Sequence, residues 1–198
     1  MINYRQDKKR YKPNKLGSLY IDEKKLCTDE QPIIYIGGQM EHRCHIFEKM
    51  GYTFDAGHNM FTGSWFYEYP LSIVNRGQYN AENFSQNLIA AIKEANLHNV
   101  ILITESYGGT IGSLATSSEL IDKVIAIHPS ILGTPLANPD SWEPYMGRFT
   151  FSQKQLLTLL KIIVDPSYGF SQDNFKGADL TKINLDKLLV VGSCIEPE

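Results

Sequence analysis

A serine stands where an apolar run gives way to a run of small residues, in the segment Thr104-Glu105-Ser106-Tyr107-Gly108-Gly109. We expect a buried strand before this serine and a helix after it, so the chain must turn sharply at Ser106. Such a turn strains the serine backbone and lifts its hydroxyl above the ends of the strands. The following helix directs the positive end of its dipole to the same place. These features predict that Ser106 is a nucleophile.

A turn this tight needs small residues two positions before and two positions after the serine. Gly108 satisfies the second position, whereas Thr104 stands at the first. Either the strand and the helix separate slightly at Thr104, or its side chain turns away. Two other interpretations remain open: Ser106 only caps the helix, or the glycines form a nucleotide-binding loop. The loop interpretation is weaker, because the G-x-G-x-x-G spacing is absent and the next strand ends at His128 rather than at an acidic residue.

A second feature is the Gly37-Gly38 turn that follows the apolar run Ile33–Ile36. The backbone N–H of Tyr107, directly after the serine, and the N–H of Gln39, directly after this turn, form a candidate oxyanion site. Two aligned donors stabilise the negative oxygen that develops during acyl transfer. The alternative is a plain turn at the end of a strand.

Short apolar runs alternate with helical patterns along the chain. This alternation predicts an α/β fold, a mainly parallel sheet with helices on both faces, whose sites lie at the carboxyl ends of the strands. The expected strands are 19–21, Ile33–Ile36, 52–54, 100–104, 124–127 and Leu188–Val191. We expect Leu188–Val191 to be buried, as are the apolar runs Ile33–Ile36, 100–104 and 124–127. The expected helices are 40–50, 81–96, 107–117 and 151–165.

Residues 31–198 resemble the α/β-hydrolase family, especially its small lipases and esterases. The resemblance is carried by residues 33–39, by the turn around Ser106, and by residues 124–137 with their Gly-Thr-Pro loop. It implies a three-layer sandwich and an acyl-enzyme mechanism in which Ser106 attacks a carboxylic ester, a histidine acts as base and a carboxylate orients it. The implied partner is a small-molecule ester with an apolar acyl or aryl group.

The family's chain order is serine, acid, histidine. Glu196, in the loop after the last predicted strand, is the candidate acid, and its alternative is an exposed residue of the tail; Asp140 is a second candidate. No histidine follows residue 128. His128, at the end of a strand, is the candidate base, and its alternative is a histidine that only packs near the site. His58 is a weaker candidate for the base.

Three explanations account for the missing downstream histidine. The favoured one is that the chain is the larger part of a longer hydrolase and lacks the C-terminal segment that bears the histidine. The second is a non-catalytic binding protein that keeps the crevice of a hydrolase. The third is a base supplied from an unusual position or by another chain.

Residues 1–30 are polar and rich in lysine, and are expected to form an N-terminal arm before a hydrolase-like domain of residues 31–198. Within that domain, residues 151–165 have a wide apolar face, which suits a lid or a helix that covers the sheet. The aromatic stretch 61–70 suits a pocket wall or core packing beneath a loop.

The composition is that of an ordinary globular protein. The 198 residues carry 19 basic and 22 acidic side chains, and the net charge of −3 argues against a nucleic-acid-binding surface. His42 and His45 lack a third metal ligand nearby, and no metal or organic cofactor is implied. No apolar run spans a membrane and the N-terminus lacks the apolar stretch of a signal peptide, so a cytoplasmic location is expected. The sequence leaves the oligomeric state and the acyl length open.

Overall fold

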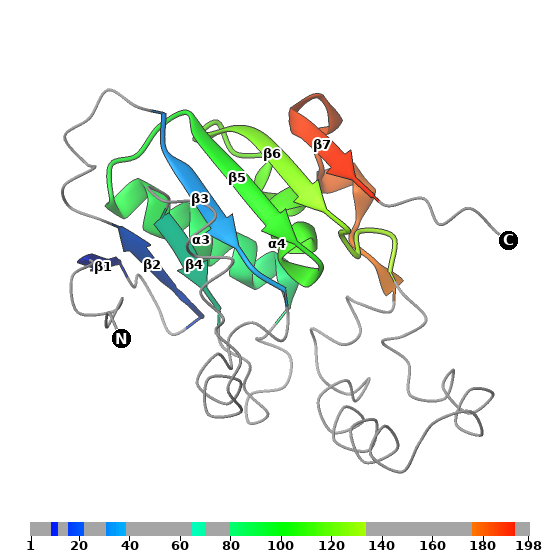
Figure 1. The fold of residues 1–198 in the computed structure, drawn as a ribbon, viewed down its shortest axis with the longest axis horizontal. Helices are drawn as coiled ribbons and strands as arrows, with labels where there is room; N and C mark the ends of the chain where they lie inside the picture. Colours follow the sequence, from blue (N-terminus) through cyan, green and yellow to red (C-terminus); the bar gives the residue numbers. More distant parts are fainter. Residues whose placement is uncertain are drawn as a thin grey trace, which may run out of the picture.

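The computed structural model describes residues 9–11, 16–21, 31–38, 65–69, 80–133 and 176–192 of the chain. These residues form a seven-stranded sheet with helices packed on it (Figure 1). The strands are β1 (Lys9–Tyr11), β2 (Ser18–Ile21), β3 (Ile33–Ile36), β4 (Trp65–Glu68), β5 (Val100–Glu105), β6 (Ile121–Ile127) and β7 (Leu188–Val191). The helices are α3 (Ala81–Glu94) and α4 (Tyr107–Ala115), and the 3-10 helices are η5 (Leu180–Lys182) and η6 (Leu185–Lys187).

The order of the strands is β1-β2-β4-β3-β5-β6-β7. From β4 to β7 every neighbouring pair is parallel, whereas β1 and β2 add antiparallel pairings at one side. The prediction of an α/β fold with a mainly parallel sheet is therefore confirmed. In the register of the sheet, Ile36 lies opposite Thr104, and Glu105 lies opposite Ile127. The residues that follow β3, β5 and β6 thus meet at the same edge of the sheet.

Wholly apolar runs were reliable predictors of strands. The predicted strands Ile33–Ile36 and Leu188–Val191 match β3 and β7, and the predicted strands 100–104 and 124–127 are the longer β5 and β6. The predicted strand 19–21 lies in β2, so part of the expected N-terminal arm is paired into the sheet through β4. The predicted elements 40–50, 52–54 and 151–165 lie outside the described residues.

Two apolar segments differ from expectation. In the aromatic stretch, Trp65, Tyr67 and Tyr69 are buried in the core, which agrees with the core-packing alternative, but part of the stretch forms β4 rather than a loop. The last strand, β7, is not buried. Leu188 packs against the core, but the next three side chains are exposed, because β7 is the edge strand of the described sheet.

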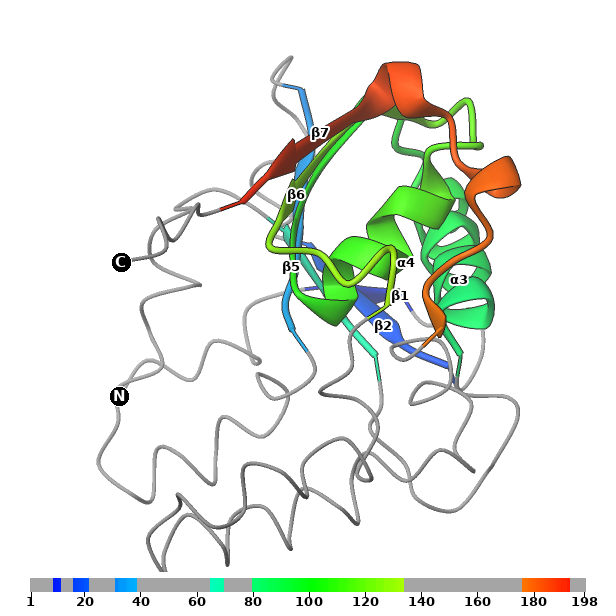
Figure 2. The same cartoon turned by 90° about the vertical axis from the view of Figure 1, so that its right-hand side faces the viewer.

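The described helices cover one face of the sheet (Figure 2). Asn80 caps α3 by accepting a hydrogen bond from the N–H of Asn83 at 2.8 Å, and Phe84, Leu88 and Ile92 present its apolar face to the core. Helix α4 is built from small residues and packs between α3 and the sheet strands β5 and β6. Helices on the opposite face, also predicted, concern residues outside the described ranges. None of the described helices is both long enough and apolar enough to cross a membrane.

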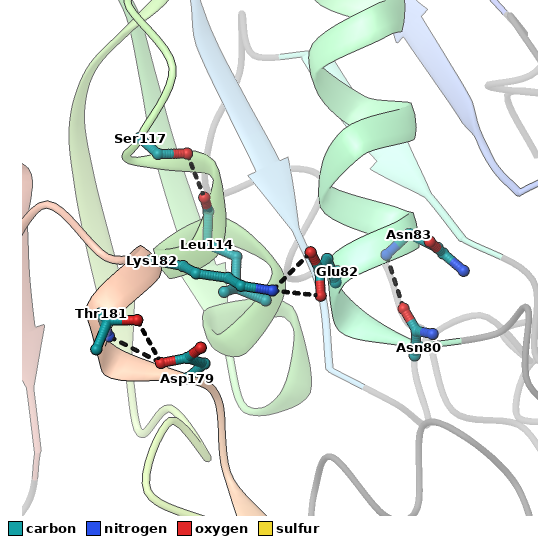
Figure 3. Close-up of polar contacts among 8 residues, drawn as sticks. All are labelled: Asn80, Glu82, Asn83, Leu114, Ser117, Asp179, Thr181 and Lys182. Carbon is teal, nitrogen blue, oxygen red and sulfur yellow. Dashed lines mark hydrogen bonds and ion pairs between the residues drawn. The ribbon is translucent and has the colours of Figure 1, made fainter.

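The segment that leads into β7 is tied to the helical layer by polar contacts (Figure 3). Lys182 of η5 forms an ion pair with Glu82 of α3 at 2.8 Å, and this contact raises the pKa of the lysine. The Asp179 carboxylate accepts hydrogen bonds from the hydroxyl and the N–H of Thr181, which lower its pKa. Lys187 donates to the carbonyl of Ile121 at 2.7 Å, so the start of β7 is held beside the start of β6.

Candidate functional site

The chain turns sharply at Ser106, between β5 and α4. The backbone torsions of Ser106 are φ 51° and ψ −121°, a conformation that is strained for a residue with a side chain. Three hydrogen bonds hold the turn. The Ser106 N–H donates to the carbonyl of Ile127 at 3.0 Å, and its carbonyl accepts from the N–H groups of Gly109 at 3.0 Å and Ser130 at 3.3 Å. Ser106 is exposed, so a rigid, strained turn carries an accessible serine.

The side chain of Ser106 does not cap the helix. Ser106 is the residue before α4, yet its hydroxyl accepts no capping hydrogen bond from the first turn of that helix. A serine whose purpose is to cap uses its side-chain oxygen in this way. The interpretation of Ser106 as a helix-capping serine is therefore wrong.

The first turn of α4 lies against the ends of the neighbouring strands. A Cβ atom at Gly108 would lie 2.5 Å from the carbonyl oxygens of Ile36 and Gly37, at the end of β3. A Cβ atom at Gly109 would lie 2.5 Å from the Cβ of Pro129, just beyond β6. Both positions therefore exclude a side chain, which explains why the residue two positions after the serine must be glycine.

Thr104, the departure from the expected small residue, is accommodated by the helix. Its side chain is fully buried and its hydroxyl donates to the carbonyl of Ile125 at 3.3 Å. Its methyl carbon Cγ2 would lie 2.6 Å from a Cβ atom at Gly112. The threonine therefore does not turn away from the helix, because the absence of a side chain at Gly112 leaves room for its methyl group.

The Gly37-Gly38 turn after β3 lies directly beside the serine. A Cβ atom at Gly38 would lie 3.2 Å from the Cβ and 3.7 Å from the Oγ of Ser106. Tyr107, whose N–H is the first candidate oxyanion donor, is the first residue of α4. Gln39, the second candidate donor, lies outside the described residues. The structure thus brings together the serine, the first donor residue and the turn that precedes the second.

A residue that the sequence analysis missed contacts this turn. Tyr69 is fully buried, and its hydroxyl donates to the carbonyl of Gly37 at 3.1 Å. Its ring centroid lies 5.8 Å from that of Tyr107 and 5.1 Å from that of Phe84. The alternation of Trp65, Tyr67 and Tyr69 with other residues has the period of a strand, and this signal could have placed all three side chains on one buried face.

The residue before the serine links two strands at the same edge. Glu105 accepts a hydrogen bond from the hydroxyl of Tyr35 at 3.0 Å. Tyr35 lies in β3 and Glu105 ends β5, so the contact fastens the two strand ends that flank the turn. This glutamate therefore has a structural partner next to the site.

His128 occupies on β6 the position that Ser106 occupies on β5, because each directly follows the paired residues Ile127 and Glu105. His128 is exposed and has a positive φ of 45°. Its backbone N–H donates to the carbonyl of Val191 at 2.8 Å. Within the described part of the chain, no hydrogen bond joins its imidazole to Ser106. Glu196, the candidate acid, lies outside the described residues. Among the residues that the structure describes, no cluster of three His, Cys, Asp or Glu side chains could hold a metal ion.

No protein-family model and no curated protein sequence matches the chain. Solved structures do match it in fold. A hydrolase from Pseudomonas aeruginosa PA01 aligns with a TM-score of 0.53 and 12% identity over 94% of this chain and 80% of its own. The N-formylmaleamic acid deformylase Nfo from Pseudomonas putida S16 aligns with a TM-score of 0.52 and 12% identity over 94% of this chain and 81% of its own. Together with the sheet order and the strained turn between β5 and α4, these similarities show that the chain has an α/β-hydrolase-like fold.

Proposed function

We propose that the chain is a serine hydrolase of the lipase or esterase type, which cleaves a carboxylic ester through an acyl-enzyme on Ser106. The observation that carries the proposal is the strained, exposed serine between β5 and α4. A conformation that costs of order 1–3 kcal/mol persists where the surrounding structure enforces it, and such residues cluster at active sites. The three hydrogen bonds to the Ser106 backbone and the glycines of α4 provide that enforcement.

The proposed reaction has two steps. The Ser106 hydroxyl attacks the acyl carbon of the ester, its proton passes to a base, and the former carbonyl oxygen becomes an oxyanion held by the N–H groups of Tyr107 and Gln39. The ester bond breaks and the alcohol leaves with the proton from the base. Water then attacks the acyl-enzyme with help from the same base, which releases the carboxylic acid and restores the serine. The mechanism uses no metal or organic cofactor.

His128 is the proposed base. Two histidines lie in the described part of the chain, and of these only His128 follows a parallel strand at the edge of the sheet where Ser106 lies; His98 is between α3 and β5, at the opposite edge. In an enzyme without substrate, catalytic hydrogen bonds are often long or poorly aligned, and they tighten when substrate binds. Glu196 is the proposed acid, because it follows β7, the strand next to β6.

A fluorophosphonate probe tests the nucleophile, because it phosphonylates an activated serine and leaves ordinary serines unmodified. The wild-type chain is expected to be labelled, and Ser106→Ala is expected to lose the label. Ser117→Ala is the matched control, since Ser117 is an exposed serine whose hydroxyl only donates to the carbonyl of Leu114. Labelling that survives in Ser106→Ala would refute the assignment of the nucleophile.

The same probe tests the base. His128→Ala is expected to slow labelling about 100-fold or more, in the range that general bases contribute, whereas His98→Ala is expected to label at the wild-type rate. Equal rates for His128→Ala and the wild type would show that the proton of Ser106 goes elsewhere.

A non-catalytic binding protein is the second candidate. It is favoured by the observation that, in the described residues, no hydrogen bond joins the imidazole of His128 to Ser106. This candidate predicts that the folded wild-type chain is not labelled by the fluorophosphonate at any practical concentration, so the experiment with Ser106 distinguishes the two.

A further inference from the structure

The Gly37-Gly38 turn poses a physical problem for an oxyanion site. Glycine is the residue with the greatest backbone freedom, and two in succession give a turn that can adopt several conformations. An oxyanion donor contributes only when it is fixed in place before the reaction, because reorienting a dipole during the reaction costs the energy that the donor should supply. Something outside the turn must therefore hold it.

The Tyr69 side chain is placed to hold the Gly37-Gly38 turn. Its hydroxyl, at the end of a fully buried side chain, donates to the carbonyl oxygen of Gly37 at 3.1 Å. A peptide group is planar and trans, so the direction of the Gly37 carbonyl also fixes the direction of the Gly38 N–H, which points the opposite way. Gly38 in turn is the residue that lies beside Ser106. One hydrogen bond thus sets the orientation of the peptide group next to the serine.

The alternative orientation of this peptide is costly for two reasons. If the peptide rotated, the buried hydrogen bond that the Tyr69 hydroxyl donates to it would be broken, and breaking such a bond costs free energy. The Gly37 carbonyl is also confined by the start of α4, since even a single carbon added at Gly108 would lie 2.5 Å from it. The turn is therefore held from one side by Tyr69 and from the other by the helix.

The same tyrosine reaches the other donor residue. The ring of Tyr69 packs against the ring of Tyr107 with a centroid distance of 5.8 Å and an interplanar angle of 59°. Tyr107 is buried and begins α4, and its N–H is the first proposed donor. A single buried side chain thus contacts both segments that supply the proposed oxyanion donors.

We infer that Tyr69 is a positioning residue, which through its hydroxyl holds the Gly37-Gly38 turn, the segment that leads to the second proposed oxyanion donor, in place beside Ser106. The inference rests on the proposed function. It deepens that proposal, because it assigns a role in the reaction to a residue of the core that does not touch the substrate.

Tyr67 provides a matched control, two positions earlier in the chain. It is equally buried, and its hydroxyl donates to the carbonyl of Phe84 at 3.1 Å and accepts from the Asn87 amide at 2.6 Å. None of these partners belongs to the turn beside Ser106. Removing either hydroxyl therefore breaks buried hydrogen bonds, at least as many at position 67 as at position 69, but only the loss at position 69 releases the turn.

The experiment compares the wild type, Tyr69→Phe and Tyr67→Phe in the rate of fluorophosphonate labelling and in kcat and KM for p-nitrophenyl acetate. Complete loss of one oxyanion donor lowers the rate about 10²–10³-fold, and a donor that is present but loosely held is expected to lower kcat about 10–100-fold in Tyr69→Phe. KM is expected to change little, because the ground-state contacts of the ester do not involve the hydroxyl. Tyr67→Phe is expected to keep kcat within about twofold of the wild type, although it loses the buried hydrogen bonds to Phe84 and Asn87.

Thermal unfolding of each variant shows that it is folded. If Tyr69→Phe does not fold, 4-fluorophenylalanine at position 69 fills the volume of the hydroxyl without donating a hydrogen bond, and the same loss of kcat is expected. Equal kcat in the wild type and in either position-69 variant overturns the inference and leaves Ser106 as the nucleophile. An equal loss in Tyr67→Phe also overturns it, because the effect would then be one of general stability. A wild type that is neither labelled nor active overturns the proposed function and this inference with it.

Discussion

Replacing Gly112 by alanine probes the packing that makes room for the serine turn. An alanine methyl at this position would lie 2.6 Å from Cγ2 of Thr104, well inside the 3.4 Å at which ordinary contacts begin. The next neighbours are less close: Cγ1 of Val124 at 3.4 Å and Cβ of Thr104 at 3.5 Å. The clash therefore comes from one methyl group, that of the threonine.

Two opposing effects decide the result. Alanine is favoured over glycine inside a helix by about 1 kcal/mol. Forcing an extra carbon into a packed core costs about 1–3 kcal/mol. Gly112→Ala is therefore expected to destabilise the protein by up to about 2 kcal/mol.

A second substitution removes the cause of the clash. Thr104→Ser deletes Cγ2 but keeps the hydroxyl that donates to the carbonyl of Ile125. Alone it is expected to cost about 1 kcal/mol for the lost buried methyl. In that background Gly112→Ala meets only ordinary contacts, so it is expected to stabilise the protein by up to about 1 kcal/mol.

Denaturant unfolding of the wild type, the two single variants and the double variant measures the coupling between these positions. A favourable coupling of about 1–3 kcal/mol is expected. If the two effects simply add, the threonine methyl does not occupy the space over Gly112, and the account of how this turn tolerates Thr104 is wrong.

Three further predictions concern the turn and the segment before β7. Gly108→Ala is expected to destabilise the protein more than Gly112→Ala, because its methyl would meet backbone oxygens at 2.5 Å. A lower denaturant midpoint for Gly108→Ala than for Gly112→Ala is therefore expected. Ser106→Gly is expected to be about 1–3 kcal/mol more stable than Ser106→Ala, because glycine relieves the strain at positive φ; equal stability would show that the turn is unstrained. Thr181→Val is expected to raise the pKa of Asp179 toward its ordinary value in an NMR titration, because the hydroxyl donor is lost. Since the folded-state pKa is the lower one, the stability that these bonds contribute is present above the ordinary pKa and is lost as pH falls through the folded-state value.

The parallel core of the fold could be predicted because its strands contain short, wholly apolar runs. A run such as Ile33–Ile36 has no charged position, a pattern that is typical of strands inside a parallel sheet. Strand β4 escaped the same reasoning. Trp65, Tyr67 and Tyr69 are buried at alternate positions, but they stand in a stretch so rich in aromatic residues that the period of two was hidden.

For β7, the prediction of a strand was right but the prediction that it is buried was wrong. The run Leu188–Val191 is as apolar as β3, yet most of its side chains are exposed. An apolar composition shows that a strand could be buried. Whether the strand lies at the centre or at the edge of a sheet depends on which other strands pair with it. That order is set by crossovers between distant segments, which a local pattern does not encode.

The position of Ser106 was predictable because its requirements are local. The turn needs an apolar strand before it and small residues after it, and both can be read within a few residues. The hydrogen bond from Tyr69 to Gly37 joins segments 32 residues apart. No pattern of neighbouring residues predicts such a contact, although the alternation through Tyr69 could have shown that its side chain is buried.

Thr104 and Gly112 show what the rule of small residues around a strained serine describes physically. The helix after the turn must approach the ends of the neighbouring strands β3 and β5, so at each close contact the helix residue or the strand residue that faces it has to lack a side chain. At one contact the glycine is Gly108, and what it faces is the backbone of β3. At the other, the strand carries a threonine and the glycine lies in the helix at Gly112. The small residue two positions before the serine is therefore dispensable in this chain, because the helix supplies the space that the strand does not.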